Sequence, residues 1–113
     1  MSITILTDTV VAAAALSANR FVTVAGAVPA AAAAVYGVTR SSAGAAGDLV
    51  PVDILGVTEV ETGAAIAVGA AIEVDASGRA ITLAAGVKCG RMAAGQAAAT
   101  AAGQFVRVHL IPN

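Results

Sequence analysis

Glycine spacing constrains the fold of this 113-residue chain more than any other feature. From residue 37 onward, glycines recur so often that the longest glycine-free interval is residues 104–113. Globular helices average about 11 to 12 residues, and glycine destabilises a helix interior. The spacing therefore predicts short strands, although alanine, the best helix former, occupies 31 positions.

Two windows, residues 50–54 and 106–110, place apolar residues at every second position, as a half-buried strand does. They belong to longer segments, 45–55 and 101–111, which align without gaps at an offset of 56 residues, with five identities and three conservative apolar exchanges. We interpret them as two copies of one unit, a glycine turn feeding a strand. Chance similarity in an alanine-rich chain is the alternative.

Further signals fit the same fold class. Gly63–Val68 and Gly69–Val74 agree at five of six positions, and we interpret them as two short strands because a solenoid needs at least three repeats. Asp75–Gly78 predicts a hairpin turn. Pro51 predicts either an edge strand or a position where no ladder donor is needed.

We therefore expect an all-β fold, a small β-sandwich or barrel of short strands with a possible internal pseudo-repeat. Residues 18–113 would form a single β domain, and residues 1–17 an N-terminal arm. Only 34 residues are large and apolar, and only 13 are charged, giving a net charge of −1. A soluble surface is usually about 25 to 35% charged, so we expect this chain to associate with neighbours.

Charge and composition argue against several function classes. Six dispersed basic residues and three aromatic residues give neither the basic patch nor the stacking platform of a nucleic-acid binder. The N-terminus has no positively charged region typical of a secretory signal. The longest uncharged stretch, residues 21–39, is interrupted by glycine and proline, so we expect no membrane span.

Candidate chemical groups are few. His109 lies on the polar face of a predicted strand, where we expect it to be solvated or in an interface. Cys89 is the only cysteine; a buried thiol is the preferred interpretation, with an intersubunit disulfide or a reactive thiol as alternatives. The acidic pairs Glu59/Glu61 and Glu73/Asp75 match no metal loop, and no phosphate-binding motif occurs. We predict no catalytic residues, no cofactor and no metal site.

The order of five segments resembles the small capsid cement, or head decoration, proteins of tailed phages and prophages. The segments are Ala18–Val24, Tyr36–Val38, Ala46–Val52, then Gly63–Ile66 with Gly69 and Asp75–Ala80, and finally Gly90–Ala93 leading to Val106–Val108. The resemblance implies a mostly β structural protein, not an enzyme, that binds the major capsid protein on the outside of the assembled head and stabilises it. It also implies synthesis in the host cytoplasm and, by analogy, a homo-oligomer, with a trimer as the first expectation.

The segment Ser2–Leu16 precedes the strand-rich part, and we predict that it lies on the capsid or on a neighbouring subunit. Its candidate contact residues are the apolar Ile3, Ile5, Leu6, Val10 and Val11. The alternative is a first strand of the subunit's own sheet. Two other function classes stay open at this point: a structural module of a phage tail or fibre, and a small ligand-binding β-barrel.

Overall fold

The computed structural model describes residues 3–112, and every regular element within them is a β-strand. The strands are β1 (Ile3–Val11), β2 (Phe21–Val22), β3 (Gly37–Thr39), β4 (Leu49–Glu61), β5 (Ala71–Val74), β6 (Ala80–Thr82), β7 (Gly90–Met92) and β8 (Phe105–Leu110). All of the strand pairings are antiparallel. The all-β prediction is confirmed.

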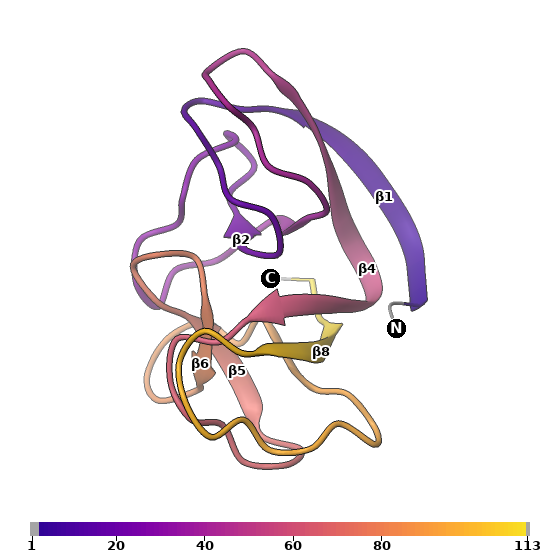
Figure 1. The fold of residues 1–113 in the computed structure, drawn as a ribbon, viewed down its shortest axis with the longest axis vertical. Helices are drawn as coiled ribbons and strands as arrows, with labels where there is room; N and C mark the ends of the chain where they lie inside the picture. Colours follow the sequence, from indigo (N-terminus) through magenta and orange to yellow (C-terminus); the bar gives the residue numbers. More distant parts are fainter. Residues whose placement is uncertain (1–2, 113) are drawn as a thin grey trace.

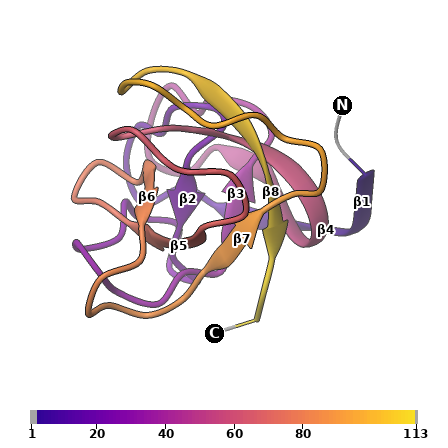
Figure 2. The same cartoon turned by 90° about the horizontal axis from the view of Figure 1, so that it is seen from below.

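One sheet curls into a nearly closed barrel. Its strands follow the order β2-β3-β4-β8-β7-β5-β6, and the two ends of this path meet where the Phe21 amide donates to the Gly78 carbonyl at 2.7 Å. β1 lies off the path and pairs with β4 alone among the described strands. Figures 1 and 2 show β1 along the outside of β4, apart from the other strands. The fold is therefore a barrel with one external strand.

Strand β4 forms part of both halves of the molecule, because it bends at Gly56. Glycine there adopts a φ of 103°, a left-handed value that other residues rarely take. β1 pairs with β4 from Leu49 to Val57 and β3 pairs with Val52 and Asp53, whereas β8 pairs with residues 57–61. We call residues 3–55 the first half of the molecule and residues 57–111 the second half.

The two halves repeat the unit predicted from the sequence. Gly47 and Gly103 both have a positive φ, at 92° and 84°, and each precedes a strand, β4 or β8. The amide of Gly47 donates to Ala12 at 2.8 Å, and that of Gly103 donates to Thr62 at 2.8 Å. Along the strands that follow, the valines at the first two inward positions are buried in both halves. The resemblance between segments 45–55 and 101–111 is therefore structural, not a chance likeness.

Hydrogen bonds extend this correspondence to segments with little sequence likeness. Leu16 and Ala43 exchange both backbone hydrogen bonds, as Ile66 and Ala99 do. Two further pairs of bonds match between the halves: Tyr36 to Val22 with Cys89 to Ile72, and Thr39 to Arg20 with Met92 to Ala70. From residue 12 to residue 22, each residue of the first half corresponds to the one 50 positions later.

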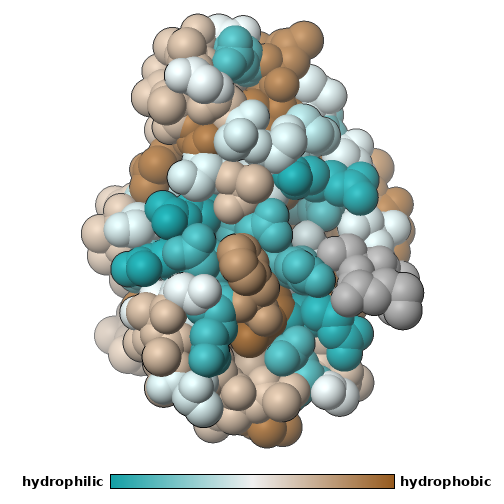
Figure 3. All heavy atoms as spheres, in the orientation of Figure 1, coloured by the Kyte–Doolittle hydropathy of each residue, from teal (hydrophilic) through white to brown (hydrophobic). Residues whose placement is uncertain are grey.

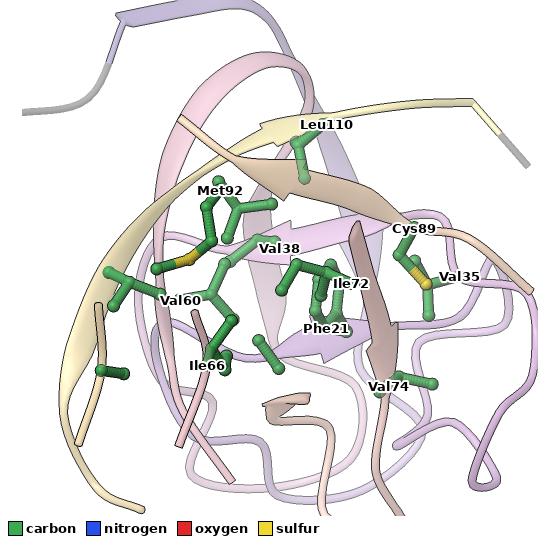
Figure 4. Close-up of a cluster of buried hydrophobic side chains, with 14 residues drawn as sticks. Phe21, Val35, Val38, Val60, Ile66, Ile72, Val74, Cys89, Met92 and Leu110 are labelled. Atoms are coloured by element: carbon green, nitrogen blue, oxygen red, sulfur yellow. The ribbon is translucent and has the colours of Figure 1, made fainter. Parts of the chain in front are cut away.

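The interior of the barrel is filled by side chains from both halves. Phe21, the largest of them, is 1% exposed and packs with residues from β3, β4, β5, β7 and β8. Figure 4 shows these side chains pointing toward one another between the strands. A second, smaller cluster joins β1 to the rest of the first half; its buried members are Val10, Ala12, Leu16, Val22, Ala43, Val50 and Val52.

Some of the local predictions are confirmed and others are wrong. The hairpin at Asp75–Gly78 is confirmed, because it joins β5 to β6 and Asp75 Oδ1 accepts from the Ser77 and Arg79 amides at 2.9 and 2.8 Å. The expected strand at Gly63–Val68 is wrong: this segment turns, and only Ile66 forms an isolated bridge. Pro51 is not on an edge strand, since β4 lies between β1 and β3. Residues 3–112 hold no apolar helix of membrane-spanning length.

Candidate interaction surface

Strand β1 carries three exposed large apolar side chains. Ile5 is 71% exposed, Leu6 50% and Val11 57%. Ile5 and Leu6 are consecutive residues, which normally point to opposite faces of a strand. The register between β1 and β4 shifts on both sides of Leu6, and this irregularity leaves both side chains outside.

A shallow apolar groove lies beside β1. It has a volume of about 330 Å³ and is lined by Leu6, Val35, Tyr36, Ile54, Leu55 and Pro112. These residues come from β1, from the segment before β3, from the bend of β4 and from the C-terminal end. On the face of the molecule seen in Figure 3, which has the orientation of Figure 1, apolar side chains form separate patches among polar ones. The groove therefore suits a small apolar segment of a partner rather than a broad apolar surface.

A polar contact closes one side of the groove. The Tyr36 hydroxyl donates to Asp8 Oδ2 at 2.5 Å, which ties β1 to the segment before β3. This hydrogen bond lowers the pKa of Asp8 below its ordinary value, with a further contribution from the Thr9 amide. The same bond raises the pKa of Tyr36. Asp8 is therefore ionised at neutral pH and holds the Tyr36 ring against the strand.

The Asp53 carboxylate, on β4, holds β1 in place through a hydrogen bond within the sheet. Its side chain is 1% exposed, and it accepts from Thr7 Oγ1 at 2.9 Å and Thr58 Oγ1 at 2.8 Å. Arg40 Nε lies 3.3 Å from the same carboxylate. A buried carboxylate is tolerated where it is hydrogen-bonded and paired, so this cluster is a structural support of β1.

The five predicted contact residues fall into three groups. Ile5, Leu6 and Val11 are exposed on β1. Val10 is only 7% exposed and packs in the second cluster, so its side chain faces the protein's own interior. Ile3 begins β1 opposite Val57, but its side chain lies outside the described residues. Residues 3–11 thus form a strand of the subunit's own sheet, as one of the two alternatives expected.

Other exposed apolar residues escaped the sequence reasoning. Leu49 is 70% exposed and pairs with Val11, while Val24 and Val68 are 74% and 69% exposed. Phe105, which corresponds to Leu49 in the second half, is 56% exposed. The signal for Leu49 and Phe105 was available, because the alternation that buries Val50 and Val106 turns the preceding residue outward.

The candidate chemical groups named in the sequence analysis lie apart from one another. His109 is exposed on β8. Glu61 pairs with Arg20 at 3.2 Å and Arg79 at 3.8 Å, whereas Glu73 is buried and accepts from the Ala84 amide. Among the described residues, no three His, Cys, Asp or Glu side chains gather where they would hold a metal ion.

Cys89 is a buried thiol, the preferred interpretation of the sequence. It is 0% exposed within the main core. Desolvation, and then the negative charge of Glu73, raise its pKa to about 11. A thiol must ionise to attack a disulfide reagent. We therefore expect Cys89 to stay unlabelled by a thiol reagent at pH 8 in the folded protein and to react fully in denaturant. Rapid labelling of the folded protein would contradict this placement.

Comparison with known proteins gives one match. The family model described as phage cement protein matches residues 2–110, nearly the whole chain. No curated protein and no solved structure is significantly similar to the chain. The matched range includes both halves of the barrel and the external strand β1.

Proposed function

This chain belongs to the phage cement protein family, and from that membership we propose that it binds the outer surface of the assembled phage capsid and stabilises it. Its role is structural, and the partner is the major capsid protein. We propose that it is made in the host cytoplasm and added to the shell. Many copies would bind one particle, so weak individual contacts sum through multivalency.

The observation that carries the choice of surface is the apolar character of β1 and of the groove beside it. β1 is held along one edge by β4 and lies outside the barrel, while Ile5 and Leu6 are mostly exposed. Burying apolar area yields about 25 cal/mol per Å². We propose that Ile5, Leu6 and the groove receive an apolar segment of the capsid protein.

The interior of the barrel gives no support to the alternative of a small-ligand carrier. Fourteen buried residues fill it, including Phe21, Ile66 and Ile72. A ligand-binding barrel keeps an enclosed cavity between its strands. The described grooves lie at the surface instead, one apolar and one lined by polar residues around Asp53.

A charge in the groove tests the proposed contact. We expect Leu6→Glu to weaken binding to undecorated capsids about tenfold, equivalent to roughly 1.4 kcal/mol, because an unpaired carboxylate would be desolvated in the contact. Co-sedimentation with purified capsids over a range of protein concentrations measures the change.

Phe105→Glu is the matched control for this test. It places the same charge on an apolar side chain that is 56% exposed, against 50% for Leu6, in the other half of the molecule. We expect the Phe105 variant to bind like the unmodified protein. Loss of binding in the Phe105 variant with none in the Leu6 variant would contradict the assignment to β1.

A further inference from the structure

Arg91 differs from the other four arginines of this chain in its surroundings. Each of those four has a carboxylate of the chain beside it: Glu61 for Arg20 and Arg79, Asp53 for Arg40, and Glu59, directly opposite across β4 and β8, for Arg107. Arg91 is exposed on β7, and no carboxylate of residues 3–112 forms an ion pair with it. Its guanidinium is therefore available to an anion that comes from outside the chain.

The residue directly opposite Arg91 also carries a nitrogen donor. Arg91 pairs with His109 across β7 and β8, and His109 pairs in turn with Val57 of β4. Both side chains are exposed, whereas the residues before and after each of them are buried. Residues directly opposite each other in an antiparallel pair have Cβ atoms about 4.5–5.5 Å apart. We call Arg91 and His109 the donor pair.

A carboxylate fits the chemistry of the donor pair. A guanidinium presents five N–H donors, and an imidazole donates from one ring nitrogen when neutral and from both when protonated. Like charges directly opposite each other destabilise a sheet, so protonation of His109 places two positive groups side by side. An aspartate or glutamate of a partner would accept hydrogen bonds from both side chains and offset this repulsion.

The donor pair lies next to the apolar groove beside β1. Pro112, which lines the groove, follows His109 by three residues, so their Cα atoms are at most about 11 Å apart. Leu55, which also lines the groove, precedes Val57 by two residues. Val57 pairs with Ile3 of β1 as well as with His109. The surface proposed to bind the capsid is therefore continuous with the donor pair.

We propose that the donor pair binds a carboxylate on the same capsid protein segment that places an apolar side chain in the groove. The inference rests on the proposed function and adds the chemistry of the partner: an apolar residue with an aspartate or glutamate no more than about 11 Å away. Interfacial charges mainly select and orient a partner. Phe105 lies four residues before His109, about 13 Å along β8, and so stays outside this site.

Charge reversal at Arg91 tests the proposal. We expect Arg91→Glu to weaken binding to undecorated capsids about tenfold at low salt, because it places an acid against the partner's carboxylate. The difference from the unmodified protein should shrink in about 1 M salt, where the screening length is about 3 Å. Co-sedimentation with purified capsids at the two salt concentrations measures both effects.

The matched control makes the same change in net charge elsewhere. Ala76→Glu combined with Ala98→Glu also adds two negative charges, at exposed positions in the β5–β6 turn and between β7 and β8. We expect this control to bind like the unmodified protein. Equal binding by Arg91→Glu and the unmodified protein, or equal losses in Arg91→Glu and the control, would overturn this inference alone. Absence of binding by the unmodified protein would overturn the proposed function with it.

Crosslinking identifies the partner group directly. Lys88 is the only lysine, so Lys88→Arg combined with Arg91→Lys moves the single lysine to the donor pair without changing the net charge. A carbodiimide then joins its amine to a carboxylate in direct contact with it. We expect crosslinks to aspartate or glutamate of the capsid protein, at least about tenfold above those from Lys88→Arg combined with Ala76→Lys. Equal yields from the two proteins, or crosslinks to a second copy of this chain in place of the capsid protein, would overturn the choice of partner.

Discussion

Replacing Phe21 with alanine is expected to lower the free energy of unfolding by about 3–5 kcal/mol. Phe21 is the largest fully buried side chain, 1% exposed, and it packs where β2 meets the strands of the second half. Small domains have a total stability of about 5–15 kcal/mol. Because much of this chain's core is alanine and valine, neighbouring side chains are too short to fill the cavity. Urea unfolding followed by circular dichroism measures the loss.

The control is the same substitution at the only other phenylalanine. Phe105 is 56% exposed, and a surface change of this kind is expected to alter stability by no more than about 0.5 kcal/mol. Equal losses for the two variants would contradict the division into a buried Phe21 and an exposed Phe105.

Gly37→Ala and Gly90→Ala are expected to destabilise the protein by similar amounts, about 1–3 kcal/mol each. A Cβ on Gly37 would lie 2.3 Å from the Asp53 carbonyl oxygen, and one on Gly90 would lie 2.5 Å from the His109 carbonyl oxygen. The two carbonyls belong to corresponding strands, β4 and β8. The methyl group added at Gly37 would therefore push β3 away from β4, and the one added at Gly90 would push β7 away from β8.

Gly44→Ala is the matched control for these two variants. A Cβ there would meet only Asp48 Oδ2, at 3.8 Å, which is an ordinary contact. We expect its midpoint of urea unfolding to stay close to that of the unmodified protein. A large loss at Gly37 with none at Gly90 would contradict the structural equivalence of the two halves.

The sequence predicted the parts of the fold that depend on local chemistry. A glycine with a left-handed backbone, followed by alternating apolar residues, marked the start of β4 and β8. The Asp75–Gly78 turn was readable because aspartate caps such turns through its own side chain. These signals act over a few residues, so one sequence suffices to detect them.

The repeat beyond segments 45–55 and 101–111 could not be predicted, because the corresponding residues share backbone hydrogen bonds and not residue types. Val11 corresponds to Glu61 and Arg20 to Ala70, pairs with no likeness in charge or size. The groove was hidden for a related reason: Leu6, Val35, Leu55 and Pro112 meet only after β4 bends. Val10 was misjudged as a contact residue although it neighbours Val11, since consecutive strand residues face opposite sides.

The structure also explains the composition. The main core is small, and several of the largest apolar side chains, among them Ile5, Leu49 and Phe105, are exposed. Small side chains lose little rotamer entropy when they are ordered, which suits a protein that makes modest contacts with many neighbours. The proposed contact with the capsid would bury part of this exposed apolar surface.

Cryo-electron microscopy of undecorated capsids mixed with the purified protein tests the central claim most directly. We predict density for this fold on the outer surface of the shell, with β1 and its groove facing the capsid protein, and a higher temperature of capsid disruption for the decorated particles. Empty capsids at saturating protein concentration would contradict the account, as would binding to tails instead of heads.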